Sequence, residues 1–152
     1  MPHVRRVRIH TRLPILIPAR ITPRLIRSLR RLPATPVLVV HVNHAQELND
    51  EVEQSLRPLL EAGVLLLNQS VLLRGVNDSV EVLESLSEKL VQARVLPYYL
   101  HQLDKVQGAA HFLVPEEEGC AIVRQLQARL PGYAVPRYVR DEPGMPCKTV
   151  LA

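Results

Sequence analysis

Residues 37–44 read Val-Leu-Val-Val-His-Val-Asn-His, an apolar run that ends in polar side chains. The pattern returns at 64–69 with Val-Leu-Leu-Leu-Asn-Gln, and residues 95–104 repeat it a third time. Short apolar runs without polar alternation are typical of parallel strands that are covered on both faces. Because segments of helical spacing lie between these runs, the sequence predicts an α/β chain with a parallel sheet, either an open layer or part of a barrel.

Capping signals predict where the helices begin and end. Thr22 and Pro23 are typical of an N-cap and a first helical residue, and Asp50 with Glu53 predicts a capping box for a second helix. These and other turn signals predict helices over 22–32, 50–63, 79–93 and 116–130, the last followed by Gly132 at C′, strands over 7–10 and 133–139, and loops over 13–18 and 101–115.

Polar side chains follow the predicted strands at their carboxyl ends, and these ends share one edge of a parallel sheet. They are His41, Asn43 and His44, then Asn68 and Gln69, then His101, Gln102 and Asp104, and finally Asp141 and Lys148. A lysine in such a Gly/Pro-bound loop is either an exposed ammonium or the amine that forms a Schiff base with a cofactor aldehyde. The residues alone leave both interpretations open, as they do for Asp104 and Asp141, which are either loop charges or ligands for an ammonium.

Composition narrows the class of protein. The chain has 47% hydrophobic and 22% charged residues, which is typical of a globular protein. Its two cysteines, Cys120 and Cys147, show neither metal-ligand spacing nor a disulfide framework, so we predict no metal site. No signal peptide or membrane-spanning run is visible, and the sequence predicts a cytoplasmic protein without a membrane partner.

Arginine is concentrated near the N-terminus, where no acidic residue precedes Glu47. This charge indicates either a phosphate-binding patch for nucleic acid or solvated residues that a partner covers. Aromatic residues make up only 3% of the chain, and no recognition motif accompanies the arginines, so nucleic-acid binding is the less favoured interpretation. The arginines concerned are Arg5, Arg6, Arg8, Arg12, Arg20, Arg24, Arg27, Arg30 and Arg31.

Four stretches resemble the radical S-adenosylmethionine family of lysine 2,3-aminomutases, and the resemblance covers residues 1–152. They are Arg8-Ile-His-Thr-Arg-Leu-Pro-Ile-Leu-Ile-Pro18, His41-Val-Asn-His44, Asn68-Gln-Ser-Val-Leu-Leu-Arg-Gly-Val-Asn-Asp78 and Tyr98-Tyr-Leu-His-Gln-Leu-Asp104. The resemblance implies the later β/α units of an incomplete, TIM-like parallel barrel with a C-terminal tail. It also implies an isomerase that converts L-lysine to β-lysine by radical 1,2-amino migration.

The resemblance assigns roles residue by residue. Lys148 matches the lysine that carries pyridoxal phosphate, and Asp104 and Asp141 match the carboxylates that bind the side-chain ammonium of the substrate. His41 and Gln69 match positions that contact S-adenosylmethionine. Retention of both aspartates argues against a glutamate enzyme, whose acidic substrate they would repel.

The family's Cys-x3-Cys-x2-Cys motif for a 4Fe-4S cluster is not found in the sequence. We therefore expect a C-terminal fragment that lacks the cluster-binding part and is inactive by itself. The loop 104–112, with His101 before it and no long extension after Lys148, is similar to the subgroup that serves modification of elongation factor P. A homo-oligomer is also expected, and the alternative function is a non-catalytic fragment that binds RNA or a protein through the basic N-terminus.

Overall fold

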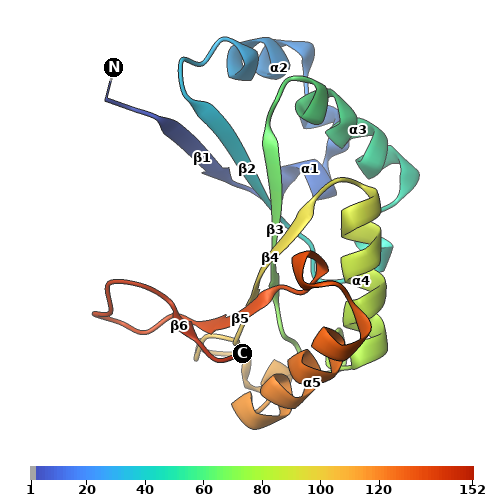
Figure 1. Cartoon of the computed structure of the whole chain (residues 1–152), viewed down its shortest axis with the longest axis vertical. Helices are drawn as coiled ribbons and strands as arrows, with labels where there is room; N and C mark the ends of the chain where they lie inside the picture. The colour runs from blue at the N-terminus through green and yellow to red at the C-terminus, as the bar shows by residue number, and fades with distance from the viewer. Residues whose placement is uncertain (1–2) are drawn as a thin grey trace.

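Six strands form one sheet in the order of the sequence, from β1 to β6, in a computed structural model that describes residues 3–152 (Figure 1). The first five strands are parallel, and the last pairs antiparallel with its neighbour. Their bounds are β1 (Arg6–His10), β2 (Thr35–His41), β3 (Leu65–Val71), β4 (Leu96–His101), β5 (Arg137–Arg140) and β6 (Thr149–Val150). The predicted α/β chain with a parallel sheet is confirmed.

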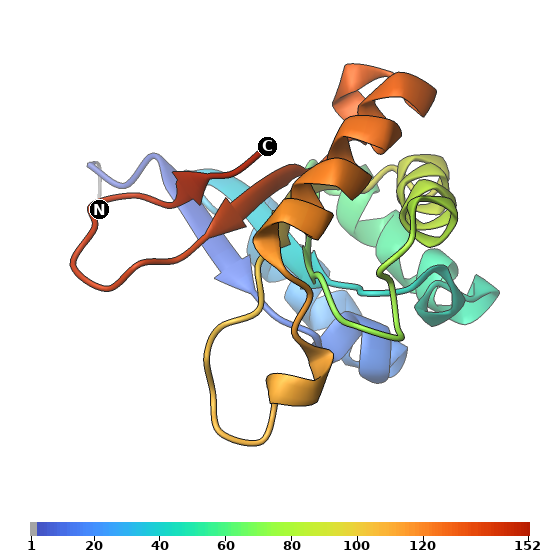
Figure 2. The same cartoon turned by 90° about the horizontal axis from the view of Figure 1, so that it is seen from below.

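The helices lie along one side of this sheet and leave its other face open, as the two perpendicular views show (Figures 1 and 2). Leu65 and Leu96 are 44% and 41% exposed on that open face, whereas their neighbour Leu66 is buried. The helices are α1 (Leu13–Leu16), α2 (Pro23–Arg30), α3 (Asp50–Glu61), α4 (Val80–Gln92) and α5 (Glu116–Arg129).

Leucine and valine side chains from the sheet and from the helices make the core between these two layers. On α3 the buried residues are Val52, Leu56 and Leu59, which recur at helical spacing and so form one face. They belong to the same core cluster as Leu38 and Leu66 of the central strands. Burial of one such side chain contributes about 1.5–3 kcal/mol, so this apolar layer is what fixes the helices to the sheet.

The ends of α2 and α3 test the capping predictions. Thr22 caps α2 through a bond from the Leu25 amide, as expected. The cap of α3 is Asn49, not the predicted Asp50, because Asn49 Oδ1 accepts the Val52 amide hydrogen bond at 2.9 Å. Asn is as good a cap as Asp, and the shift by one residue leaves Asp50 in the first turn, where the helix dipole stabilises a carboxylate.

The end of α5 differs from the prediction. The helix ends at Arg129, Leu130 is already extended, and Gly132 begins a 3₁₀ turn instead of serving as the C′ residue. Pro131 has no amide hydrogen and cannot continue the helix. The last parallel strand consequently begins at Arg137, later than the predicted range 133–139.

Besides short 3₁₀ turns, one α-helix and one strand were not predicted, and the strand shapes the site. A short helix, α1, replaces the expected loop at 13–18. The C-terminal tail turns back as β6, so that Val150 pairs with Val139 and Thr149 with Arg140. Residues 141–148 thereby become the loop of a hairpin at the edge of the sheet (Figure 2).

Within residues 3–152 the helices are all too short or too polar to cross a membrane.

Candidate functional site

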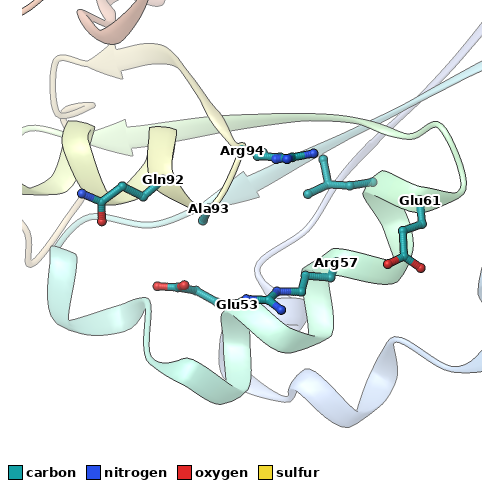
Figure 3. A pocket seen from close by; sticks show the side chains of 7 residues that line it. Glu53, Arg57, Glu61, Gln92, Ala93 and Arg94 are labelled. Atoms are coloured by element: carbon teal, nitrogen blue, oxygen red, sulfur yellow. The ribbon is translucent and has the colours of Figure 1, made fainter.

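A cleft of about 840 Å³ lies at the carboxyl ends of the strands, within the size range of small-molecule sites. Its lining includes every site residue that the sequence predicted, namely His41, Gln69, Asp104, Asp141 and Lys148. These residues come from the ends of β2, β3 and β4 and from the hairpin between β5 and β6. A second hollow of about 500 Å³ lies at the opposite end of the sheet, among charged residues that include Arg57 of α3 and Arg94 in the turn after α4 (Figure 3).

Lys148 and Asp141 face one another across the hairpin. Lys148 Nζ donates hydrogen bonds to both carboxylate oxygens of Asp141, at 2.6 and 2.5 Å. The Lys148 ammonium, with a smaller contribution from His101, holds the pKa of Asp141 below its ordinary value. Lys148 Nζ also lies 5.7 Å from the centre of the Tyr99 ring, a distance at which a cation and an aromatic face attract.

His101 ends β4 and contacts the same carboxylate. Its Nδ1 lies 3.4 Å from Asp141 Oδ2. Burial, and next the charge of Lys148, lower the pKa of His101, so the imidazole is neutral at neutral pH. An ionised carboxylate only accepts hydrogen bonds, so we assign the single ring proton to Nδ1, which leaves Nε2 as an acceptor. This Nε2 is buried without a partner among the described residues.

His41 and Gln69 lie side by side because the register of β2 and β3 pairs them. The Gln69 side-chain oxygen is 3.2 Å from His10 Nδ1, and the His10 and His41 rings meet edge to face at 6.1 Å. Burial, followed by the charges of His10 and Arg12, lowers the pKa of His41. His41 Nε2 is the other buried ring nitrogen without a partner in residues 3–152. Two residues that line the cleft, His41 and His101, thus each carry a buried ring nitrogen without a hydrogen-bond partner in residues 3–152.

Three relatives with curated names match nearly the whole chain, although no family model matches it. The L-lysine 2,3-aminomutase of Escherichia coli (strain K12) is 51% identical over 151 residues, which is 99% of this chain and 44% of that protein. The enzyme of the same name from Haemophilus influenzae is 47% identical, over 100% of this chain and 45% of that protein. The one from Clostridium subterminale is 46% identical, over 98% and 36%. The chain belongs to the lysine 2,3-aminomutase family. It spans less than half the length of these relatives, and it matches their C-terminal part.

Buried amides hold the loops around the cleft of this lysine 2,3-aminomutase family member. Asn68 is buried, accepts a hydrogen bond from the Val42 amide at 2.9 Å and donates to the Val42 carbonyl at 3.1 Å. Asn77 likewise donates to the carbonyls of Asn43 and Val71, both at 2.9 Å. Asn68, which the sequence grouped with the polar residues of the site, does not line the cleft, because its side chain bonds the backbone of Val42 just after the end of β2.

Gln102 and Tyr138 join the two strand ends that carry the acidic residues, and sequence reasoning assigned no role to Tyr138. The buried Tyr138 hydroxyl donates to Gln102 Oε1, and Gln102 Nε2 donates to the Val114 carbonyl at 2.9 Å. The backbone N–H of Gln102 also donates a hydrogen bond to the Val139 carbonyl oxygen, at 2.8 Å. This connection fixes β4, which leads to Asp104, against β5, which leads to Asp141.

Asp104 lines the cleft from the loop after β4. Burial and the charge of Lys148 lower the pKa of His101, and the charges of Asp141 and Asp104 offset only part of this lowering. Arg74 lies outside the cleft and pairs with Glu118 at 2.9 and 2.8 Å. Within residues 3–152, three or more His, Cys, Asp or Glu side chains nowhere gather in a group that could hold a metal ion. A primary amine, carboxylates and unpaired buried nitrogens in one cleft fit an aldehyde cofactor with an amino-acid substrate.

Proposed function

We propose that this chain forms the cofactor- and substrate-binding part of an L-lysine 2,3-aminomutase, which converts L-lysine to β-lysine. The observation that supports the proposal is the single cleft that holds Lys148, Asp141 and Asp104. The names of the relatives, each 46–51% identical over nearly the whole chain, supply the substrate. Because the chain covers less than half of each relative, the activity belongs to a longer protein.

In this proposal the aspartates select the substrate by its distal ammonium. A carboxylate left without a partner in a cleft is unfavourable, so an amino acid that lacks the second ammonium binds less well. Lys148 holds pyridoxal phosphate, while His41 and Gln69 contact S-adenosylmethionine. The cofactors, including a 4Fe-4S cluster, supply the radical and the group transfer, and the protein positions the substrate against them.

Two finer proposals concern the longer protein. The open edge of β1 and the bare sheet face suit the later strands of an incomplete barrel, with residues 1–152 as its C-terminal part. The sequence has only Cys120 and Cys147, so we propose that the cluster ligands lie outside these residues and that the 152 residues alone do not turn over lysine. The loop from His101 to Phe112 supports a role in elongation factor P modification, in the cytoplasm.

Covalent labelling tests the role of Lys148. The chain is incubated with pyridoxal phosphate, reduced with borohydride and digested, and the modified lysine is located by mass spectrometry. The sequence contains three lysines, so Lys89 and Lys105 serve as controls within the same molecule. We expect Lys148 to be modified well above the other two, since it alone of the three lysines lines the cleft. Equal modification of all three lysines contradicts the proposal.

A second candidate function is binding of RNA by the basic N-terminal segment. Eight of its arginines are exposed and, in the described part of the chain, form no ion pair; the exception is Arg12, which pairs with Glu47. Non-specific phosphate contacts make affinity fall steeply with salt. This function predicts a salt-sensitive RNA affinity that is lost on replacing Arg5, Arg6 and Arg8 by alanine but kept on replacing Arg57 and Arg94. An affinity that does not change with salt contradicts it.

A further inference from the structure

The acidic side of the cleft already holds an ammonium group, and that group is the chain's own. Lys148 Nζ donates to both oxygens of Asp141 at 2.6 and 2.5 Å. The lysine side chain ends in the same primary ammonium as the free amino acid L-lysine. The carboxylate proposed to recognise the substrate is thus occupied by a chemical copy of the substrate's distal end.

We propose that Lys148 occupies the ammonium site of Asp141 in the free chain, and that an external lysine binds this site more tightly once Lys148 has bonded an aldehyde cofactor. The proposal rests on the proposed function and adds an order of binding to it. One residue thereby performs two successive tasks, first as an internal occupant of the ammonium site and then as the attachment point of the cofactor.

The chemistry of attachment explains the exchange. When an ammonium condenses with an aldehyde, two of its hydrogens leave with the aldehyde oxygen as water, and the third is released as a proton or stays on nitrogen. The attached nitrogen therefore keeps at most one N–H group. It no longer donates separate hydrogen bonds to both oxygens of Asp141, and at least one oxygen becomes free for another donor.

His101 explains why Asp141 stays in place after the exchange. Its Nδ1 lies 3.4 Å from Asp141 Oδ2. His101 is the last residue of β4, and this strand is held on one side by β3 and on the other by β5. Asp141 itself directly follows β5. The carboxylate thus keeps one fixed partner on β4 while its mobile partner, the flexible side chain of Lys148, is replaced.

The internal ammonium should weaken the binding of lysine moderately and not block it. The Lys148 and Asp141 side chains are 28% and 51% exposed, and pairs that water reaches are weak. Measured energies for such pairs correspond to a competition of about two- to fivefold in affinity. A difference of that size sets the preferred order of binding while leaving exchange fast.

Calorimetry of L-lysine binding to the 152-residue chain, without cofactor, tests whether Lys148 occupies the ammonium site of Asp141. Lys148→Met keeps a long unbranched side chain without charge, and we expect it to bind L-lysine about two- to fivefold more tightly than the unmodified chain. Lys148→Arg keeps the charge and should bind as weakly as the unmodified chain. Adding Asp141→Asn to Lys148→Met should abolish the gain. Equal affinity in the unmodified, Met and Arg forms overturns the proposal, as does the absence of lysine binding in all of them.

The reciprocal measurement uses pyridoxal phosphate as the probe. Release of Lys148 from its pair by Asp141→Asn should raise its equilibrium modification about two- to fivefold, while Lys89 and Lys105 in the same molecule stay unchanged. Modification of Lys148 that is selective but insensitive to Asp141→Asn overturns the order of binding and leaves the proposed function intact. Unselective modification overturns the proposed function itself.

Discussion

Gly119 of α5 faces Tyr138 of β5, and its replacement by alanine tests how closely this helix packs on the sheet. An ideal Cβ at this position would lie 2.3 Å from the Tyr138 hydroxyl oxygen and 2.6 Å from the carbon that bears it. Ordinary contact requires about 1 Å more than the shorter of these distances. Tyr138 is fully buried, so the ring has no free space into which it can retreat.

Three contributions set the expected magnitude. Overpacking of a buried site costs about 1–3 kcal/mol. Displacement of Tyr138 also breaks its hydrogen bond to Gln102 and leaves buried polar atoms without partners, at about 1–3 kcal/mol. Against these losses, alanine is better than glycine inside a helix by about 1 kcal/mol. We therefore expect Gly119→Ala to lower the free energy of unfolding by about 3 kcal/mol, which is about 6–12 °C in melting temperature for a chain of this size.

Urea denaturation followed by circular dichroism measures this change. The matched control is Gly132→Ala, since a Cβ at Gly132 meets no atom within 4 Å and the residue does not have a left-handed backbone. Tyr138→Phe removes the atom in closest contact, so Gly119→Ala should cost less in that background than in the unmodified chain. A Gly119→Ala chain as stable as the control, with an unchanged dependence on urea, would refute this account of the packing.

The other predictions concern the cleft and the loops that support it. Lys148→Ala should raise the pKa of Asp141 toward its ordinary value, and carboxyl NMR titration of both chains checks this; a midpoint that does not rise contradicts the ion pair. Because the folded pKa of Asp141 is lowered, the pair stabilises the fold above the ordinary carboxyl pKa, and this stability is lost as the pH falls through the lowered value. Asn68→Ala should lower the free energy of unfolding by about 1–3 kcal/mol, because the buried Val42 amide loses its acceptor while Ser70 still donates to the Val42 carbonyl. Urea denaturation measures this loss, and a loss smaller than that of the exposed control Gln46→Ala refutes the role of Asn68.

The sequence predicted the structure best where the signal comes from residues close together in the chain. The apolar runs before His41 and before Asn68 predicted buried parallel strands, and both strands lie there. Thr22 followed by proline predicted a helix start correctly, because an N-cap bond joins residues three apart. The end of α5 was missed because Gly132 offers a familiar stop signal, whereas Pro131 acts one residue earlier.

The sequence predicted that the candidate residues lie at one edge of the sheet, but it did not predict the contacts that they make there. Strand ends gather at one edge of a parallel sheet, and this rule alone brought His41, Gln69 and Asp104 into one cleft. Tyr138 gave no signal, since one buried tyrosine in a strand looks like any other core residue. Its partnership with Gln102 joins residues 36 apart in the sequence, and only the fold brings them together.

The C-terminal residues 149–152 show why sequence patterns did not predict the contacts of the site. Thr149–Val150 is too short for a periodic signal, yet its pairing with β5 turns the chain back on itself. Backbone hydrogen bonds from Tyr138 to Ala152 and from Leu151 to Tyr138 extend this pairing by two further residues. Without this return the ammonium of Lys148 and the carboxylate of Asp141 would be two solvated loop charges. With it they become one ion pair at the cleft, so the residues that bring Lys148 to Asp141 are the four that follow it, Thr149 to Ala152.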